Sequence, residues 1–88
     1  MNLQDTFGKN LKYYRYQKNY SQEKLAEKVN IDSRYLSDLE NGKYSPSFPK
    51  IERIAEALEI EPYLLFKKDT NHSLLAPRVD IYRTTKYR

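Results

Sequence analysis

The chain has 88 residues, contains no cysteine and carries a formal net charge of +4. This length fits one small domain, and without cysteine the chain has neither disulfide bonds nor a cysteine-based zinc site. The N-terminal residues lack the apolar segment of a secretory signal, and no run of about 18 apolar residues occurs, so we expect a cytoplasmic protein without a membrane span.

The positive charge is concentrated at the two ends of the chain. Residues 1–24 contain five basic and two acidic side chains, and residues 70–88 contain four basic and one acidic. Residues 25–69 contain seven basic and nine acidic side chains, so this middle part has a net charge of −2. Basic surface patches favour partners that carry phosphate groups, but a net charge of +4 does not by itself identify one.

The first predicted helix covers residues 4–18. Phe7, Leu11 and Tyr14 follow one another at spacings of four and three residues, which places them on one apolar stripe of a helix. A second helix of about eight residues follows Ser21, which has the right side chain for an N-cap. Its apolar face consists of Leu25, Ala26 and Val29.

A third helix is predicted over Ser33–Asn41. Asn30 ends the second helix, because asparagine tolerates the left-handed backbone conformation that a sharp helix end requires. Asp32 occupies the N-cap position of the third helix, and Gly42 occupies the position after its C-cap, where glycine is common. The side chains expected to face the core are those of Leu36 and Leu39.

A fourth helix is predicted after Ser47, which acts as its N-cap. Pro49 falls in the first turn of this helix, where no backbone N–H is needed. The apolar positions recur at intervals of three and four residues and form the strongest amphipathic pattern in the chain: Ile51, Ile54, Ala55 and Leu58. A short fifth helix is expected to begin at residues 61–62.

The pattern changes after residue 69. Residues 70–77 have the composition of a linker, and residues 79–87 are rich in β-branched and aromatic residues, which favours an extended strand. We therefore divide the chain into residues 1–69, which contain the five helices, and a basic tail of residues 70–88. Three roles remain open for the tail: a strand that pairs with a partner chain, an arm that contacts nucleic acid, or a disordered end.

The second and third helices together have the features of a helix-turn-helix. In this motif the second of the two helices enters the major groove of DNA with its N-terminal end. With its two leucines turned to the core, the third helix would expose Ser33, Arg34 and Ser37. Because an arginine can donate two hydrogen bonds to one guanine, we predict that this helix recognises a DNA sequence.

The segment SQEKLAEKVNIDSRYLSDLENGKYSPSFPKIERIAEALEI resembles the lambda-repressor-like, Cro/Xre-type helix-turn-helix family, which typically has the pattern S-Q-E-x-L-A-x-x-x-x-[IV]-x-x-x-x-[IL]-S-x-[IL]-E-x-G. The resemblance extends from about Leu11 to Phe66. It implies a compact all-α fold of five helices around one core, sequence-specific binding of double-stranded DNA, and usually a dimer on an inverted-repeat operator. Asn19 and Asn30 replace glycines that are common in the family.

The resemblance also implies residues that contact the DNA backbone. Gln22 would hydrogen-bond a phosphate and brace the third helix, which is the recognition helix. The further phosphate contacts would come from Tyr35, Asn41 and Lys43. In the family a glutamate of the third helix pairs with an arginine of the first helix, and the corresponding residues here are Glu40 and Arg15.

Contacts to base edges are expected from the outward face of the recognition helix. The resemblance assigns this role to Ser33, Arg34 and Ser37. Asp38 follows Arg34 by four residues, so it could orient the guanidinium group or accept a hydrogen bond from a cytosine amino group.

Enzymatic functions lack the residues that they would need. His72 is the only histidine, and Gly8 and Gly42 are the only glycines, so the chain offers neither a catalytic triad nor a glycine-rich phosphate loop. We expect no enzymatic activity, metal or cofactor. We predict a transcriptional regulator of bacterial or phage type that acts as a dimer. Two alternatives remain: the antitoxin of a two-protein pair that regulates its own synthesis, and a protein-interaction module that has lost DNA binding.

Overall fold

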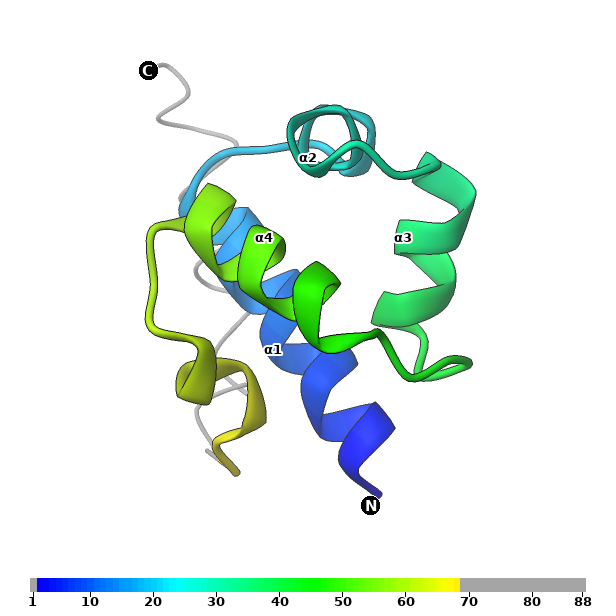
Figure 1. Ribbon diagram of the computed structural model, residues 1–88, viewed down its shortest axis with the longest axis vertical. Coiled ribbons are helices and arrows are strands. Elements are labelled where there is room, and N and C mark those ends of the chain that lie inside the picture. The colour runs from blue at the N-terminus through cyan, green and yellow to red at the C-terminus, as the bar shows by residue number, and fades with distance from the viewer. Residues whose placement is uncertain (1, 69–88) are drawn as a thin grey trace.

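The computed structural model describes residues 2–68, so the predictions for residues 70–88 lie outside the described residues. Four α-helices and one 3₁₀ helix follow one another along the chain (Figure 1). Residues 2–68 contain no strand, so this part of the fold is all-α. The elements are α1 (Leu3–Gln17), α2 (Gln22–Val29), α3 (Ser33–Glu40), α4 (Phe48–Leu58) and the 3₁₀ helix η1 (Pro62–Phe66).

The predicted fifth helix is a 3₁₀ helix rather than an α-helix. It has five residues and begins at Pro62, which lacks a backbone N–H, and such short segments often close with the tighter 3₁₀ hydrogen bonds. The first and third helices begin and end within one residue of their predicted bounds. In α3 the last helical residue is Glu40, and Asn41 is the C-cap.

Side-chain caps begin three of the four α-helices in residues 2–68. The side-chain oxygen of Asn2 accepts a hydrogen bond from the backbone N–H of Asp5 (2.8 Å), and the Ser21 hydroxyl accepts one from that of Lys24 (3.0 Å). Ser47 caps α4 in the same way, at 3.3 Å. The serine caps confirm the starts predicted for α2 and α4, because each serine satisfies an N–H group that has no partner within its helix.

The predicted side-chain cap at Asp32 is not formed. The backbone of Asp32 has the extended conformation of an N-cap, but its carboxylate makes no capping hydrogen bond to α3. Asp32 is exposed, so water can solvate both the carboxylate and the first N–H groups of the helix. Its negative charge is still favourable beside the positive end of the helix dipole.

Each α-helix is followed by a residue with a left-handed backbone. Asn19, Asn30 and Gly42 have φ angles of 68°, 60° and 76°, and asparagine and glycine adopt this conformation more easily than other residues. Glu59 ends α4 with a φ angle of 59°. The sequence did not indicate this residue, because glutamate has no intrinsic preference for the left-handed region.

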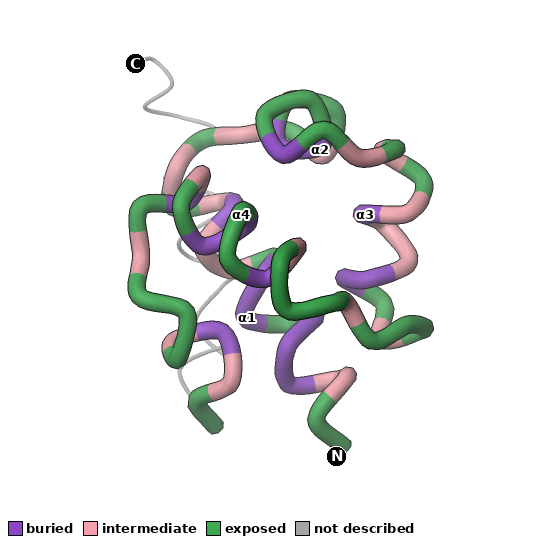
Figure 2. Tube along the Cα trace, in the orientation of Figure 1, coloured by how far each residue is buried: buried purple, intermediate pink, exposed green. Residues whose placement is uncertain are grey.

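Buried residues, purple in Figure 2, occur on every helix, and the apolar ones among them form one core. It contains every core position predicted for α2, α3 and α4, and Tyr14 of α1 packs against it as a half-buried side chain. Complete burial of one large aliphatic or aromatic side chain stabilises a fold by roughly 1.5–3 kcal/mol. The core consists of Phe7, Leu11, Leu25, Ala26, Val29, Leu36, Leu39, Ile51, Ile54, Ala55, Leu58 and Leu65.

The backbones of α1 and α3 approach each other closely at Gly8. A β-carbon at this position would lie 2.5 Å from the carbonyl oxygen of Glu40 and 2.6 Å from that of Leu39. Only glycine fits here without movement of the backbone, since real β-carbon contacts are not this short. The contact seats the C-terminal end of α3 directly on α1.

Asn10 attaches η1 to α1. Its amide nitrogen donates hydrogen bonds to the carbonyl oxygens of Leu65 (2.8 Å) and Lys67 (3.0 Å). The ring of Phe66 also packs against Phe7, with 5.4 Å between the ring centroids.

In the described part of the chain, no helix has the length and apolar character needed to cross a membrane.

Candidate nucleic-acid interface

α2 and α3 meet at a sharp turn. Asn30 leaves α2 in the left-handed conformation, and the N–H of Ile31 donates a hydrogen bond to the carbonyl oxygen of Ala26 (2.9 Å). Ile31 is half-buried and packs against the core. Figure 1 shows α2 nearly end-on and α3 from the side, so the two helices cross at a steep angle. This is the arrangement of a helix-turn-helix.

α3 has one face in the core and one face toward solvent. Leu36 and Leu39 are fully buried, whereas Arg34 is exposed. The helical spacing places the four side chains that were predicted to contact bases on the solvent side of α3. They are Ser33, Arg34, Ser37 and Asp38, and all of them except the exposed arginine are half-buried.

A buried network of charged and polar groups holds the C-terminal end of α3. The guanidinium group of Arg15 donates to both carboxylate oxygens of Glu40, from Nε at 2.6 Å and from Nη2 at 3.1 Å. A third hydrogen bond runs from Nη1 of Arg15 to the carbonyl oxygen of Tyr20 (2.9 Å). Only 7% of the Arg15 side chain and 3% of the Glu40 side chain are exposed. The ion pair between α1 and α3 that the resemblance implied is therefore present and buried.

Gln22 joins this network from the first position of α2. Its side-chain amide donates to Oε1 of Glu40 at 2.9 Å, so Glu40 connects all three helices. The bracing role expected for Gln22 therefore has a direct structural basis. A side-chain amide has two N–H groups, and one hydrogen bond to Glu40 leaves Gln22 with a second donor.

The loop between α3 and α4 packs against α3 through a pair of tyrosine rings. The rings of Tyr35 and Tyr44 stack with 5.9 Å between their centroids, and Nζ of Lys50 lies 5.7 Å from the centroid of Tyr35. Gln4 donates a hydrogen bond to the hydroxyl of Ser45 at 2.8 Å, which attaches the loop to α1. Tyr35 thus has a packing role that sequence reasoning missed, since the stacking partner lies in an irregular segment.

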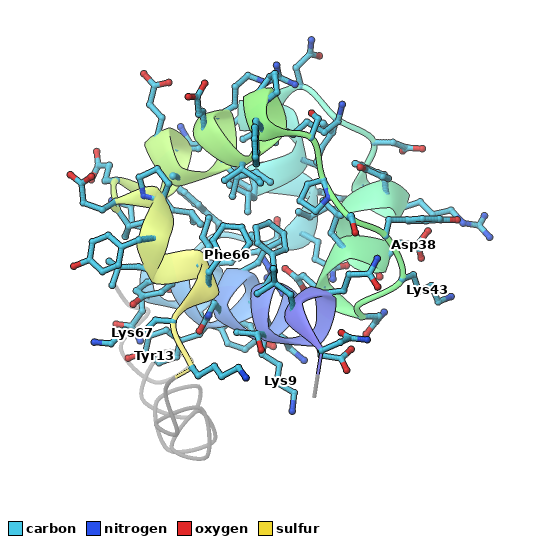
Figure 3. All side chains as sticks on the ribbon, turned by 60° about the horizontal axis from the view of Figure 1, so that its bottom comes forward. Lys9, Tyr13, Asp38, Lys43, Phe66 and Lys67 are labelled. Carbon is cyan, nitrogen blue, oxygen red and sulfur yellow. The ribbon has the colours of Figure 1, made fainter. Side chains whose placement is uncertain are left out.

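Lys43 and Asp38 form an ion pair at the C-terminal end of α3. Nζ of Lys43 lies 3.8 Å from Oδ1 of Asp38, and both side chains are on the same side of the molecule in Figure 3. The lysine side chain is 64% exposed and the aspartate side chain 22%. Within residues 2–68, Arg34 makes no ion pair with Asp38, so Lys43 rather than Arg34 is the charged partner of this aspartate.

Phe48 is an exposed residue near this site that sequence reasoning did not single out. It is the first residue of α4, directly after the loop, and 82% of its surface is exposed. Phe48 precedes the amphipathic pattern of α4, which starts at Ile51, and this position could have indicated that its side chain is exposed. Asn41, which was predicted to contact a phosphate, is also exposed between α3 and this loop.

A family model described as helix-turn-helix matches residues 11–65 of the chain. The chain belongs to this helix-turn-helix family. The matched residues include the whole turn, the buried network around Glu40 and the loop that carries Lys43. The family is one of DNA-binding transcriptional regulators rather than enzymes, and the predicted family, all-α architecture and DNA-binding motif are confirmed.

Relatives with known names include regulators of phage and bacterial origin. The chain is 35% identical over 65 residues to the immunity repressor protein of Bacillus phage phi105, which covers 74% of this chain and 45% of the repressor. The chain therefore spans less than half of that relative. It is 39% identical over 62 residues to the control protein C.BamHI of Bacillus amyloliquefaciens, which covers 69% of this chain and 76% of the relative.

A solved structure with a similar fold is that of the restriction-modification controller protein C.AhdI from Aeromonas hydrophila. It has a TM-score of 0.69 and 38% sequence identity, and the comparison covers 72% of this chain and 96% of the controller protein. The similarity therefore includes almost the whole of that controller protein.

Proposed function

We propose that this chain is a sequence-specific, double-stranded DNA-binding regulator of transcription that acts as a dimer on an inverted-repeat operator. The observation that carries the proposal is the seating of α3. Its buried side is fixed by the Glu40 network and by the contact at Gly8, while its other side presents polar groups to solvent. A recognition helix has to be held rigidly in this way to read bases at fixed positions.

The base contacts in this proposal come from the solvent side of α3. Arg34 donates two hydrogen bonds to a guanine, and the hydroxyl groups of Ser33 and Ser37 donate to or accept from neighbouring bases. Asp38 accepts a hydrogen bond from a cytosine amino group. Arg34 is exposed and makes no ion pair in residues 2–68, which supports its role because a free guanidinium group can approach a base edge.

The phosphate contacts in this proposal surround the recognition helix. Gln22 lies at the start of α2, where backbone N–H groups and the helix dipole also favour an anion. Asn41 and Lys43 follow the other end of α3, and Tyr35 would contribute through its hydroxyl group. Because α3 itself has more acidic than basic residues, most of the affinity has to come from these surrounding groups.

Dimerisation and the role of residues 70–88 are further parts of the proposal. A dimer presents two recognition helices to half-sites about one turn of DNA apart, roughly 34–36 Å. Residues 70–88 would support it as a strand between the two chains or as an arm on DNA. Removal of these residues, followed by measurement of the oligomeric state and of operator affinity, separates the roles. A change from dimer to monomer indicates the strand, lower affinity of an intact dimer indicates the arm, and no change in either indicates that the tail has neither role.

The proposed function is tested by selection of bound sequences from a random pool of duplex DNA. We expect enrichment of an inverted repeat, and the affinity for that repeat should fall steeply as the salt concentration rises, because phosphate contacts release counterions. A pool that yields no enriched sequence would overturn the proposal.

A further inference from the structure

We infer that Asp38 is a specificity-determining residue: it acts as an internal counter-ion that holds the phosphate-binding Lys43 and thereby disfavours duplex DNA that lacks the operator sequence. The inference rests on the proposed function, because it requires that α3 and the following loop meet DNA. It differs from the base contact proposed for Asp38, because it concerns DNA on which that contact cannot be made.

The path of the backbone itself places Asp38 and Lys43 close together. The N–H of Lys43 donates a hydrogen bond to the carbonyl oxygen of Asp38 at 3.0 Å, across the left-handed Gly42. The stacking of Tyr44 on Tyr35 fixes the loop immediately after the lysine. The backbone therefore keeps the two side chains within reach of each other, and Nζ of Lys43 lies 3.8 Å from Oδ1 of Asp38.

The two partners of this ion pair differ in their access to solvent. The Asp38 side chain is 22% exposed and stays close to the helix, whereas the Lys43 side chain is 64% exposed. A phosphate can therefore take the ammonium group by rotation of the long lysine side chain. When it does so, the carboxylate of Asp38 loses its cation and remains close to the negative phosphates.

This exchange has different consequences on the two kinds of DNA. Non-specific binding consists almost entirely of phosphate contacts, so nothing replaces the lost partner of Asp38. On the operator, a cytosine amino group placed opposite Asp38 donates to the carboxylate and offsets the loss. Asp38 thus weakens binding to non-operator DNA more than binding to the operator, and the ratio of the two affinities increases.

The size of the effect follows from the charges involved. Two unit charges about 4 Å apart in water interact strongly enough to change an equilibrium constant about fivefold. Removal of the Asp38 charge should strengthen binding to non-operator DNA by about this factor. It should also steepen the salt dependence by up to about 0.9 in the logarithmic slope, because the unpaired carboxylate of the wild type offsets about one neutralised phosphate.

The test compares Asp38→Asn with the wild type on a mixed-sequence duplex of about 30 base pairs and on the repeat recovered by selection, between about 50 and 200 mM salt. Glu61→Gln is the matched control, because it removes the same charge from an exposed residue. Glu61 makes no ion pair in the described part of the chain and lies at the start of η1, away from α3 (Figure 1). We expect about fivefold tighter binding of the mixed-sequence duplex by Asp38→Asn only, and a smaller affinity ratio between the two duplexes.

A second background tests whether Asp38 acts through Lys43. In Lys43→Gln, the additional change Asp38→Asn should strengthen mixed-sequence binding less than it does in the wild type. An equal gain in Asp38→Asn and Glu61→Gln, an unchanged affinity ratio, or a gain that persists in full without Lys43 would each overturn the inference. These outcomes leave the proposed function intact, whereas a wild-type protein that binds neither duplex would overturn both.

Discussion

Two ion pairs in this molecule have the same length and different surroundings. The closest N–O distance is 2.6 Å both in Arg15–Glu40, beneath α3, and in Lys18–Glu59, which joins the C-terminal ends of α1 and α4. The first pair is 7% and 3% exposed, and the second is 30% and 74% exposed. The pair that holds α3 is thus almost dry, whereas the pair between the C-terminal ends of α1 and α4 is accessible to water.

The comparison shows that the surroundings of an ion pair, not its length, decide what its loss costs. Water solvates and screens each charge of an exposed pair, so little is lost when one partner is removed. A buried charge without its partner has no such compensation. Arg15 and Glu40 also share hydrogen bonds with Gln22 and with the backbone of Tyr20, so their loss would disturb three segments at once.

The largest effect is expected for Glu40→Gln. This change leaves the Arg15 guanidinium group buried without an anion, and we expect a loss of roughly 3–5 kcal/mol in the free energy of unfolding. Urea denaturation measures the loss. Glu59→Gln makes the same chemical change in the exposed pair and serves as the control, and similar losses in both variants would contradict the comparison.

A smaller loss is expected for Gly8→Ala, which tests the backbone contact beside the buried pair. The added methyl group would press on the carbonyl oxygens of Leu39 and Glu40, and overpacking of this kind costs roughly 1–3 kcal/mol. Thermal denaturation should show a lower midpoint. Lys9→Ala is the control on the next, exposed position of α1, and a Gly8→Ala variant as stable as this control would argue against the close seating of α3.

A still smaller effect is expected from the exposed pair, and it depends on pH. The hydrogen bond between the two side chains lowers the pKa of Glu59 below its ordinary value of 4.5 and raises the pKa of Lys18 above its ordinary value of 10.5. The stabilisation is therefore complete between these two ordinary values. It is lost as the pH falls through the lowered pKa of Glu59, or as it rises through the raised pKa of Lys18.

Denaturation midpoints measured across this pH range should show the change. Glu59→Gln should remove the part of the acid-side loss that comes from Glu59, because the neutral amide does not titrate. If wild type and variant lose stability in parallel below pH 4.5, Glu59 contributes nothing to the acid side.

The smallest effect on stability is expected for Arg34→Ala, because this exposed charge has no partner in residues 2–68. The free energy of unfolding should change by less than about 0.5 kcal/mol. In the proposed function the same change relaxes the preference at one base position by roughly 1–3 kcal/mol, as binding to variants of the selected repeat can measure. Lys43→Ala should instead weaken binding to all DNA sequences alike. A loss of affinity at one base position in Lys43→Ala would mean that Lys43, rather than Arg34, contacts a base.

The helices and their turn could be predicted because their signals are local. Ser21, Asn30 and Ser47 set helix ends through their own side chains, and the spacing of the leucines and isoleucines defined the core. The pairing of Arg15 with Glu40, which are 25 residues apart, came from resemblance rather than from any local signal.

The remaining features depend on how distant segments meet, which no local pattern encodes. The closeness of Gly8 to α3 requires the packing of two helices, and the stacking of Tyr44 on Tyr35 requires the path of an irregular loop. The left-handed conformation of Glu59 opposes the preference of its residue type. The pairing of Asp38 with Lys43 was not predicted, because Arg34, four residues before Asp38 on the same helix, was also a suitable partner.

The two hydrogen bonds from Asn10 have a mechanical consequence. They bind the chain at Leu65 and Lys67 to α1, the same helix that holds α3 through Arg15, which is five residues further along. At about 1.5 Å of rise per residue, the two attachment points lie roughly 7.5 Å apart along the helix axis. A force that pulls on the chain at residue 68 would therefore act on the middle of α1. Because Arg15 of the same helix holds α3, a displacement of α1 would also displace the recognition helix.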